Sequence, residues 1–422
     1  MISFNNRVKN RLIKWLSSFA AALIPRSNKI WVVGGNQGLR FADNSMYFFL
    51  YCSANAGKNI IWLTRSKGII EEVHRKGGQA HLTNSLWGLY YGFRAKWHVY
   101  DVGIGDTNAF SSRGAKRLNL WHGYPLKDLT FLKGVKQGNP TPKNGAALKI
   151  KVRRLRKKMR SERHDYLLWQ NTKYMDHALN SFNVRADNII IANYPRNMVF
   201  SEGFDEDYYF PQASKVARLQ INEFREKGKK IIGYFPTWRG DDGDLFMGME
   251  GEDQLLELGR FCEQNDIIIV TKWHTCLYKE YDHSGQSERA QGITSILYDL
   301  PSILVLGFEL DLNSILNKID ILVTDYSGVL FDFLWSDRPI IFFPYDLENY
   351  RKNWGFFFDY VKFVPGDIVL DTDALKKRLE EYCSNPDGYS SRHKEARESV
   401  CSDIFEVTTG TPLIVEKMKS VN

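Results

Sequence analysis

The stretch ILVTDYSGVLFDFLW, residues 321–335, contains a short apolar segment, a polar turn and a second apolar segment. The spacing predicts a buried strand over 321–324 and a helix over 329–335. Open parallel sheets bind their ligands at the carboxyl ends of strands, where this turn would lie. The free amides at the helix start and the hydroxyls of Thr324 and Ser327, beside Asp325 and Gly328, therefore predict an anion site.

The same alternation of strand and helix recurs on both sides of this stretch. It predicts two consecutive α/β domains with parallel sheets, separated near residues 201–211. The expected strands are 30–33, 60–64, 98–102, 118–121, 166–169 and 189–192 in the first half and 231–235, 267–271, 303–305, 321–324 and 340–343 in the second.

Length and composition agree with a folded protein of this size. The 422 residues are enough for two or three domains of roughly 100 to 200 residues each, and 43% of them are hydrophobic. No apolar run approaches the roughly 20 residues of a membrane span. The cysteines lie far apart without a C-x-x-C pair, which excludes a disulfide framework and a zinc site and predicts a reducing cytoplasm. They are Cys52, Cys262, Cys276, Cys383 and Cys401.

Positive charge is concentrated in two segments of a chain whose formal net charge is +8. The first acidic residue is Asp43, and apolar residues recur at helical spacing until Pro25, which predicts an amphipathic membrane-associating helix within residues 1–28. Two alternatives are a signal peptide and a helix that packs on the domain. The second segment, 149–163, carries nine basic residues and one acid. We expect a peripheral protein on the cytoplasmic membrane face, bound to anionic lipid by both segments.

Basic and polar residues follow several predicted strands directly. His122 lies in a glycine-containing turn after 118–121, where an imidazole can act as a base or can bond its own turn. Arg239 offers a planar fork that suits phosphate, and Lys272 and His274 follow the next strand. The acidic loop 241–244 suggests a metal ligand set, but without a second ligand cluster a solvated turn is favoured.

Several common active-site motifs are absent from the sequence. No G-x-x-x-x-G-K-[ST] loop and no G-x-G-x-x-G follows a predicted strand, which argues against a P-loop NTPase and a dinucleotide oxidoreductase. Neither a G-x-S-x-G elbow nor an H-E-x-x-H motif occurs, so hydrolase interpretations lose support.

Taken in order, the strand-end segments resemble the motifs of the CDP-glycerol glycerophosphotransferase family, the teichoic acid primases and polymerases. The resemblance runs from about residue 30 to residue 405, and many motifs in one order are more specific than any of them alone. The segments are D-N at 43–44, W-H-G with P-L-K at 121–127, N-Y-P-R-N at 193–197, Y-F-P-T-W-R at 234–239, K-x-H at 272–274, T-D-Y-S at 324–327, P-I-I-F at 339–342, Y-D-L at 345–347 and F-F-F-D-Y at 356–360.

The resemblance implies a GT-B architecture of two Rossmann-like, doubly wound domains facing a cleft. Residues 29–205 would bind the acceptor and 206–422 the CDP-alcohol donor. Members transfer an alditol phosphate, with glycerol phosphate expected here, to a lipid-linked acceptor and release CMP. The implied residues are His122 and His274 for catalysis; Thr237, Arg239, Lys272, Thr324, Asp325, Ser327, Gly328 and Asp346 for the donor; and Asp43, Asn44, Tyr124, Lys127 and Arg196 for the acceptor side.

The sequence departs from the family pattern at four positions. Tyr124 replaces a small hydroxyl residue, Gly328 a second serine, Thr275 a proline and Met198 an acid. A bulky Tyr124 beside His122 would reshape the acceptor mouth, so the sequence leaves open which alditol and acceptor are used. It also leaves open single addition against polymerisation, teichoic acid against capsule, and the oligomeric state.

Two other functions compete with phosphoalditol transfer. A GT-B glycosyltransferase that uses a nucleotide sugar would have the same architecture. A non-catalytic membrane- or nucleic-acid-binding protein would explain the basic run, but that run lacks the interleaved aromatic residues that stack on bases, and we expect no nucleic-acid partner. We also expect no tightly bound cofactor or metal, because positive groups and helix amides can hold a diphosphate; whether Mg²⁺ bridges it is left open.

Overall fold

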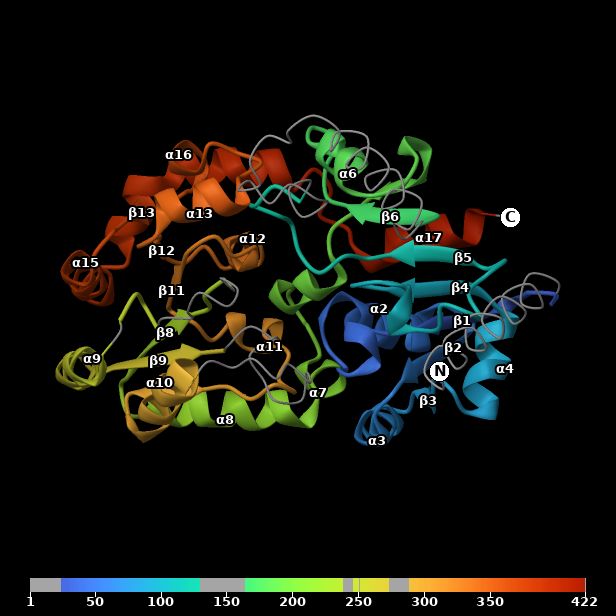
Figure 1. Ribbon diagram of the computed structural model, residues 1–422, viewed down its shortest axis with the longest axis horizontal. Coiled ribbons are helices and arrows are strands. Elements are labelled where there is room, and N and C mark those ends of the chain that lie inside the picture. Colours follow the sequence, from blue (N-terminus) through green and yellow to red (C-terminus); the bar gives the residue numbers. More distant parts are fainter. Residues whose placement is uncertain (1–23, 130–163, 238–245, 250, 273–287, 422) are drawn as a thin grey trace, which may run out of the picture. The chain divides into compact units, whose positions relative to one another are not determined.

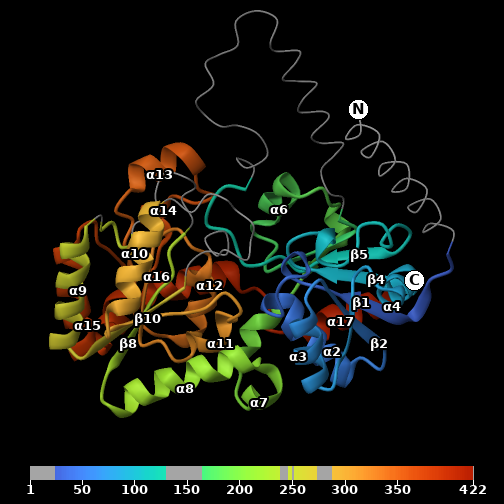
Figure 2. The ribbon, with the colours of Figure 1, turned by 60° about the horizontal axis from the view of Figure 1, so that its bottom comes forward.

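The computed structural model describes residues 24–129, 164–237, 246–249, 251–272 and 288–421. Two compact units divide the chain (Figures 1 and 2). The amino-terminal unit contains Met1–His122, Asn144–Pro211 and Phe405–Asn422. The carboxy-terminal unit contains Gly123–Lys143 and Gln212–Ile404. Residues 1–23 of the predicted amphipathic segment 1–28 and the whole basic run 149–163 lie outside the described residues.

The amino-terminal unit is built on a parallel sheet of seven strands in the order β3-β2-β1-β4-β5-β6-β7. Most of its strands contain an apolar run, because helices cover both faces of a parallel sheet. Trp31, Trp62, Trp97 and Trp169 lie fully buried in it. The strands are β1 (Ser27–Val33), β2 (Asn59–Thr64), β3 (Gln79–Leu82), β4 (Ala95–Tyr100), β5 (Lys116–Asn119), β6 (Tyr166–Trp169) and β7 (Ile189–Ile191).

The helices of this unit connect successive strands and include the returning end of the chain. The α-helices are α2 (Asp43–Asn55), α3 (Lys67–Arg75), α4 (Leu86–Arg94), α6 (Met175–Ser181), α7 (Glu206–Tyr209) and α17 (Thr411–Ser420), and the 3₁₀ helices are η1 (Asn36–Gly38), η2 (Ile104–Asp106), η4 (Ala186–Asn188) and η5 (Pro195–Phe200). Figures 1 and 2 both show red α17 among the blue and cyan elements of the unit. The Asn193 amide donates to the Thr409 carbonyl at 3.2 Å, which fixes residues 405–422 here.

The carboxy-terminal unit has a parallel six-stranded sheet in the order β10-β9-β8-β11-β12-β13. Strand β8 is central and pairs with both β9 and β11. The strands are β8 (Lys230–Tyr234), β9 (Ile267–Thr271), β10 (Ile303–Val305), β11 (Ile321–Thr324), β12 (Ile340–Phe342) and β13 (Asp367–Ile368). The helices are α8 (Gln212–Glu226), α9 (Glu252–Gln264), α10 (Glu288–Asp299), α11 (Asn313–Leu316), α12 (Val329–Phe333), α13 (Leu347–Trp354), α14 (Tyr360–Phe363), α15 (Thr372–Ser384) and α16 (Asp387–Ile404).

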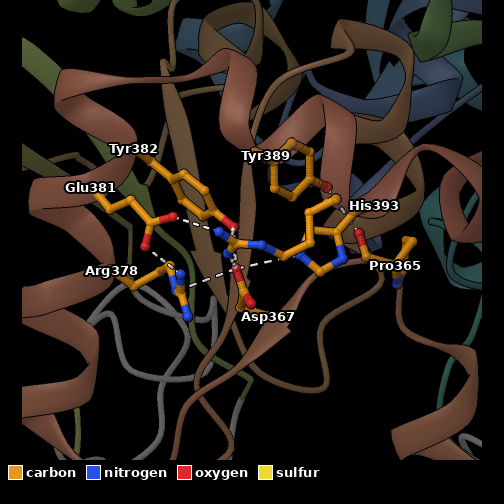
Figure 3. A network of polar contacts seen from close by, with 8 residues as sticks. Pro365, Asp367, Arg378, Glu381, Tyr382, Tyr389 and His393 are labelled. Atoms are coloured by element: carbon orange, nitrogen blue, oxygen red, sulfur yellow. Dashed lines mark hydrogen bonds and ion pairs between the residues drawn. The ribbon is translucent and has the colours of Figure 1, made fainter.

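A polar network joins strand β13 to the last two helices of this unit (Figure 3). Asp367 on β13 accepts a hydrogen bond from the hydroxyl of Tyr382 on α15, and its Oδ2 lies 3.3 Å from Nε2 of His393 on α16. Arg378 and Arg392 also contact the Asp367 carboxylate, both at 3.3 Å. The network therefore fastens α15 and α16 to the edge of the sheet.

The expected strands are present, and two further strands are short ones that the sequence analysis missed. Strand β3 has the polar sequence QAHL, and β13 has two residues, so neither shows an apolar run. The predicted boundaries 29–205 and 206–422 also differ from the observed units, because Phe405–Asn422 belongs to the first unit and Gly123–Lys143 to the second. Lys127, for example, forms an antiparallel backbone β-bridge with Phe356.

None of the helices in the described part of the chain is long and apolar enough to cross a membrane. Among the same residues, no group of three or more His, Cys, Asp or Glu side chains is placed to hold a metal ion. The described cysteines, Cys52, Cys262, Cys383 and Cys401, are free thiols.

Candidate functional site

The turn that carries His122 is held in place by residues from three other elements. After β5, Trp121 adopts a positive φ of 57°, and its amide donates to Oδ1 of Asn119 at 2.8 Å. Asn44 of α2 donates through Nδ2 to the Trp121 carbonyl at 2.8 Å. Nη1 of Arg196 donates to the His122 carbonyl at 2.9 Å. The backbone of this turn is therefore fixed while the His122 side chain is exposed.

The contact of the His122 ring with the end of β4 determines which nitrogen carries the proton. Nδ1 of His122 lies 3.3 Å from the Asp101 carbonyl oxygen. A carbonyl can only accept, so Nδ1 carries the hydrogen in the neutral ring and Nε2 is the basic nitrogen. This tautomer is the one that a general base at Nε2 requires.

Asp43 and Arg196 form an ion pair beside this turn. Oδ1 of Asp43 lies 2.7 Å from Nη1 of Arg196, whose side chain is 7% exposed. Burial raises the pKa of Asp43, but the charges of Arg196 and His122 and the Asn44 amide outweigh it and lower the pKa. Asp43 is therefore a carboxylate at neutral pH, and by the same interaction it favours the protonated form of His122.

The N-Y-P-R-N segment positions Arg196 from within the unit. It follows β7 and forms η5, with Pro195 at its start and Arg196 and Asn197 buried. Nδ2 of Asn197 donates to Oδ1 of Asn193 at 2.8 Å. Sequence analysis assigned Asp43, Asn44 and Arg196 to the acceptor side, and the structure brings all three to the His122 turn.

Two buried carboxyl groups near this turn were missed by the sequence analysis. Asp106 accepts from the amides of Val102 at 2.8 Å and Gln37 at 2.7 Å. Burial, the charge of Asp106 and the charge of Asp43 raise the pKa of Asp101 well above its ordinary value. This shift favours the protonated form of Asp101, because burial and the neighbouring aspartates oppose a further negative charge here. The signal available in the sequence was the segment D-V-G-I-G-D at 101–106, in which two aspartates flank two glycines at the end of a predicted strand.

In the carboxy-terminal unit, the ends of the paired strands β8 and β11 bring Thr237 and Asp325 together. Asp325 is buried, and both its oxygens lie 3.1 Å from the Thr237 amide. The Thr237 hydroxyl donates to Oδ1 of Asp325 at 2.8 Å. Asp325 thus fixes the turn after β8 by accepting both hydrogen bonds. Thr237 and Asp325 were both predicted to bind the donor.

Aromatic residues surround the Asp325 turn, and two of them, Tyr326 and Tyr360, lie in motifs of the resemblance but were given no role by the sequence analysis. The Tyr326 hydroxyl donates to Oδ1 of Asp346 at 2.7 Å, and its ring stacks on Tyr350 at 3.8 Å between centroids. The Tyr360 hydroxyl donates to the Asp325 carbonyl at 3.0 Å. Asp346, predicted to bind the donor, is therefore tied to the same turn.

Thr324 differs from the other predicted donor residues in the hydrogen bonding of its hydroxyl. Its side chain is fully buried at the carboxyl end of β11, and Oγ1 has no hydrogen-bond partner among the described residues. A buried hydroxyl without a partner is unfavourable, because it loses its bonds to water without replacement. A phosphate oxygen of a bound donor would supply that partner.

Ser327 and Gly328 begin the helix that the sequence predicted over 329–335. Oγ of Ser327 accepts from the Val329 amide at 3.4 Å, and helix α12 continues into a 3₁₀ turn at Leu334–Ser336. A Cβ at position 328 would lie 2.7 Å from the Tyr124 carbonyl oxygen. Glycine is therefore required for the close approach of the 124 backbone, which explains the departure from serine.

Tyr124 and Lys127 were predicted on the acceptor side, with residues 29–205, but the structure places both in the carboxy-terminal unit. The Tyr124 ring packs on Phe331 at 5.1 Å. Burial lowers the pKa of Lys127, and the charge of Asp325 opposes that shift. The reason for the difference is backbone pairing, since the 124–129 segment hydrogen-bonds to residues 355–357 rather than to the first sheet.

Lys272, a further predicted donor residue, bonds the protein itself. Its ammonium donates to the carbonyls of Gly307 at 2.5 Å and Phe308 at 3.1 Å, so it supports the loop after β10. Arg239 and His274 lie outside the described residues, as does the acidic loop 241–244. Their predicted roles remain predictions.

The two units, each built on a parallel sheet, have the architecture of the GT-B fold class. The chain belongs to the CDP-glycerol:poly(glycerophosphate) glycerophosphotransferase family, whose sequence model matches residues 20–403. The resemblance inferred from the motifs is thereby confirmed.

Individual relatives and a solved structure agree with this family. A teichoic acid glycerol-phosphate transferase of Staphylococcus aureus is 26% identical over 91% of this chain and 94% of its own length. A teichoic acid poly(glycerol phosphate) polymerase of Bacillus spizizenii is 27% identical over 85% of each chain. The structure of the wall teichoic acid polymerase TagF, at 21% identity, covers 98% of this chain and 96% of its own with a TM-score of 0.69. That likeness confirms the predicted fold class.

Proposed function

We propose that this protein transfers glycerol phosphate from CDP-glycerol to a hydroxyl of a membrane lipid-linked acceptor and releases CMP, as a step in teichoic acid synthesis. The observation that carries the proposal is the His122 turn, which presents an imidazole in the base-competent tautomer within a chain of this family. The glycerol phosphate substrates are taken from the family and from the two relatives that match most of their own length.

In the proposed reaction the acceptor oxygen attacks the phosphorus atom that carries glycerol. A new P–O bond forms, the bond from this phosphorus to the bridging oxygen breaks, and CMP leaves with that oxygen. The acceptor proton goes to Nε2 of His122. Asp43, paired with Arg196, stabilises the resulting imidazolium, because a carboxylate nearby favours the charged ring.

The donor diphosphate is proposed to bind at the strand ends of the carboxy-terminal unit. The unpartnered hydroxyl of Thr324 would donate to a phosphate oxygen, and the ammonium of Lys127 adds positive charge near Asp325. Arg239, His274 and Ser327 complete the proposed phosphate ligands, and Asp346 lies near the nucleotide. Because a transferring phosphoryl group needs mainly positioning and charge stabilisation, we propose that no tightly held metal is required.

The test is product analysis with the purified full chain. CDP-glycerol, CDP-ribitol and UDP-glucose are each supplied with a lipid-linked acceptor, and released CMP and UDP are separated by chromatography. We expect CMP with CDP-glycerol, a loss of at least 100-fold in turnover for His122→Ala, and retained donor binding. His74→Ala, on the exposed face of α3, is the matched control.

Two outcomes would contradict the proposal. Release of UDP without CMP would establish a nucleotide-sugar transferase instead. Near-normal CMP release by His122→Ala would remove His122 from the mechanism while leaving the family assignment intact.

A further inference from the structure

Helix α4 presents an exposed aromatic face on the amino-terminal unit. Leu86, Trp87 and Tyr90 are 87%, 61% and 49% exposed, and their spacing places them on one side of the helix. The aromatic rings pack on one another, since the centroid of the Trp87 ring lies 5.8 Å from that of Tyr90 and 6.2 Å from that of Tyr91. Tyr91 in turn accepts a hydrogen bond from Gln79 at 3.0 Å.

The opposite side of α4 explains why this face points outward. A Cβ at Gly88 would lie 2.1 Å from the Leu82 carbonyl oxygen, and a Cβ at Gly92 would lie 2.4 Å from Oγ of Ser111. The helix therefore packs on the unit through its bare backbone at two glycines four residues apart. With that side fixed, the larger apolar side chains of α4 are directed away from the unit's core.

Positive charge lies at the carboxyl end of the same helix. Arg94 donates to the Pro25 carbonyl at 2.5 Å, and Arg26 donates to the carbonyls of Gly92 and Arg113. The pKa of Arg26 is lowered to about 10, mainly by burial, and the repulsion from the charge of Arg94 adds to that shift. An anionic surface beside Arg94 would relieve that repulsion.

We propose that this face, Leu86, Trp87 and Tyr90 with Arg94 and the exposed Arg113, docks on an anionic phospholipid surface. Trp and Tyr combine an apolar ring with a polar group and favour the boundary between headgroups and acyl chains. The arginines supply the complementary charge to anionic headgroups.

Two other occupants fit the observations less well. Three exposed side chains are far fewer than the roughly 20 to 30 residues per side of a stable protein interface, which disfavours a second copy of this chain. The segment that precedes Pro25 carries arginine and lysine without any acid, so it has the same sign of charge as the end of α4. That shared charge favours lipid as the common partner of both.

The first experiment measures flotation of the full chain with vesicles of phosphatidylcholine alone or mixed with phosphatidylglycerol. The variant Leu86→Ser/Trp87→Ser/Tyr90→Ser is expected to lower the partition coefficient on the anionic vesicles at least tenfold. Leu219→Ser/Tyr298→Ser removes two side chains of the other unit that are each 62% exposed, and it should bind like the unaltered protein. Arg94→Gln/Arg113→Gln should reduce the salt-sensitive part of binding.

A second experiment locates Trp87 itself. The chain has 11 tryptophans, so the emission of Trp87 is obtained as the difference between the unaltered protein and Trp87→Phe. Brominated phospholipid should quench this difference signal, and anionic vesicles should shift it to the blue. Circular dichroism checks whether the triple variant is folded. Because Trp87→Phe is a milder change, it tests the inference even if the triple variant misfolds.

Several results would overturn the inference. Unchanged flotation of the folded triple variant would exclude α4 as the docking face. A Trp87 signal that is already blue-shifted without vesicles, and that brominated vesicles do not quench, would indicate cover by residues 1–23. A signal that depends on protein concentration would indicate a second copy. The inference adds a surface to the proposed function, and since these vesicles contain neither donor nor acceptor, its failure is distinguishable from failure of the transferase assignment.

Discussion

The Asp367 network makes a quantitative prediction for the variant Asp367→Asn (Figure 3). Burial raises the pKa of Asp367, but hydrogen bonds from His393 and Tyr382 and the charges of Arg378 and His393 outweigh it and lower the pKa from 3.8 to about 2. At about 1.4 kcal/mol per pKa unit the carboxylate stabilises the fold by roughly 2.5 kcal/mol. Arg392 is 41% exposed, so solvent screens part of this, and we expect about 1–2 kcal/mol.

The pH dependence follows from the lowered pKa. The carboxylate contributes its full stability above the unfolded pKa of 3.8, and the contribution disappears as the pH falls through about 2. The variant lacks it at every pH. The difference in unfolding free energy between the two proteins should therefore be constant from pH 7 to about pH 5 and shrink progressively below about pH 4.

The assay is urea unfolding of the full chain followed by circular dichroism at several pH values. Glu395→Gln is the control, because Glu395 is an exposed acid on the same helix, α16. A destabilisation below about 0.3 kcal/mol at pH 7, or a difference that grows as the pH falls to 3, would refute the role assigned to the carboxylate.

Three further predictions concern the proposed reaction and its supporting turns. Asp43→Asn removes a carboxylate beside the proposed base, so the acidic limb of the kcat/KM profile should move to lower pH by about one unit; an unmoved limb would show that Asp43 only supports the fold. Thr324→Val removes a buried hydroxyl that has no partner among the described residues, so KM for the donor should rise about tenfold with unfolding stability changed by less than about 1 kcal/mol. An unchanged KM would argue against a phosphate contact at Thr324. Gly328→Ala forces a Cβ against the Tyr124 carbonyl and should cost about 1–3 kcal/mol in urea unfolding, whereas Gly105→Ala, which meets nothing within 4 Å, should cost less than about 1 kcal/mol. Equal losses for the two glycines would contradict the close approach.

Most strands could be predicted from the sequence because a buried parallel strand consists of a short run of apolar residues. Residues 166–169, 267–271 and 303–305 were predicted with the bounds that the structure shows. The two missed strands lack this signal, since β3 is polar and β13 is two residues long. Local pattern therefore decides most of the sheet, and pairing with an existing edge decides the rest.

The candidate site was predicted where chemistry follows a strand directly, and missed where it depends on packing. The grouping of Asp43 and Arg196 followed from family motifs, and their ion pair joins residues 153 positions apart. The raised pKa of Asp101 depends on burial and on the charge of Asp106, and the spacing of residues in the sequence shows neither. The placement of Tyr124 likewise depends on pairing with residues far along the chain.

The return of residues 405–422 to the amino-terminal unit has a consequence for synthesis on the ribosome. The strands of that unit are translated first, but Asn193 and the surface under α17 acquire their partners only when Thr409 and residues 411–420 have emerged. The carboxy-terminal unit, contained within residues 123–404, is translated before that closure. The amino-terminal unit is thus translated first but completed last. Until α17 has been synthesised, the apolar residues beside α2 that it covers stay exposed and could bind a chaperone.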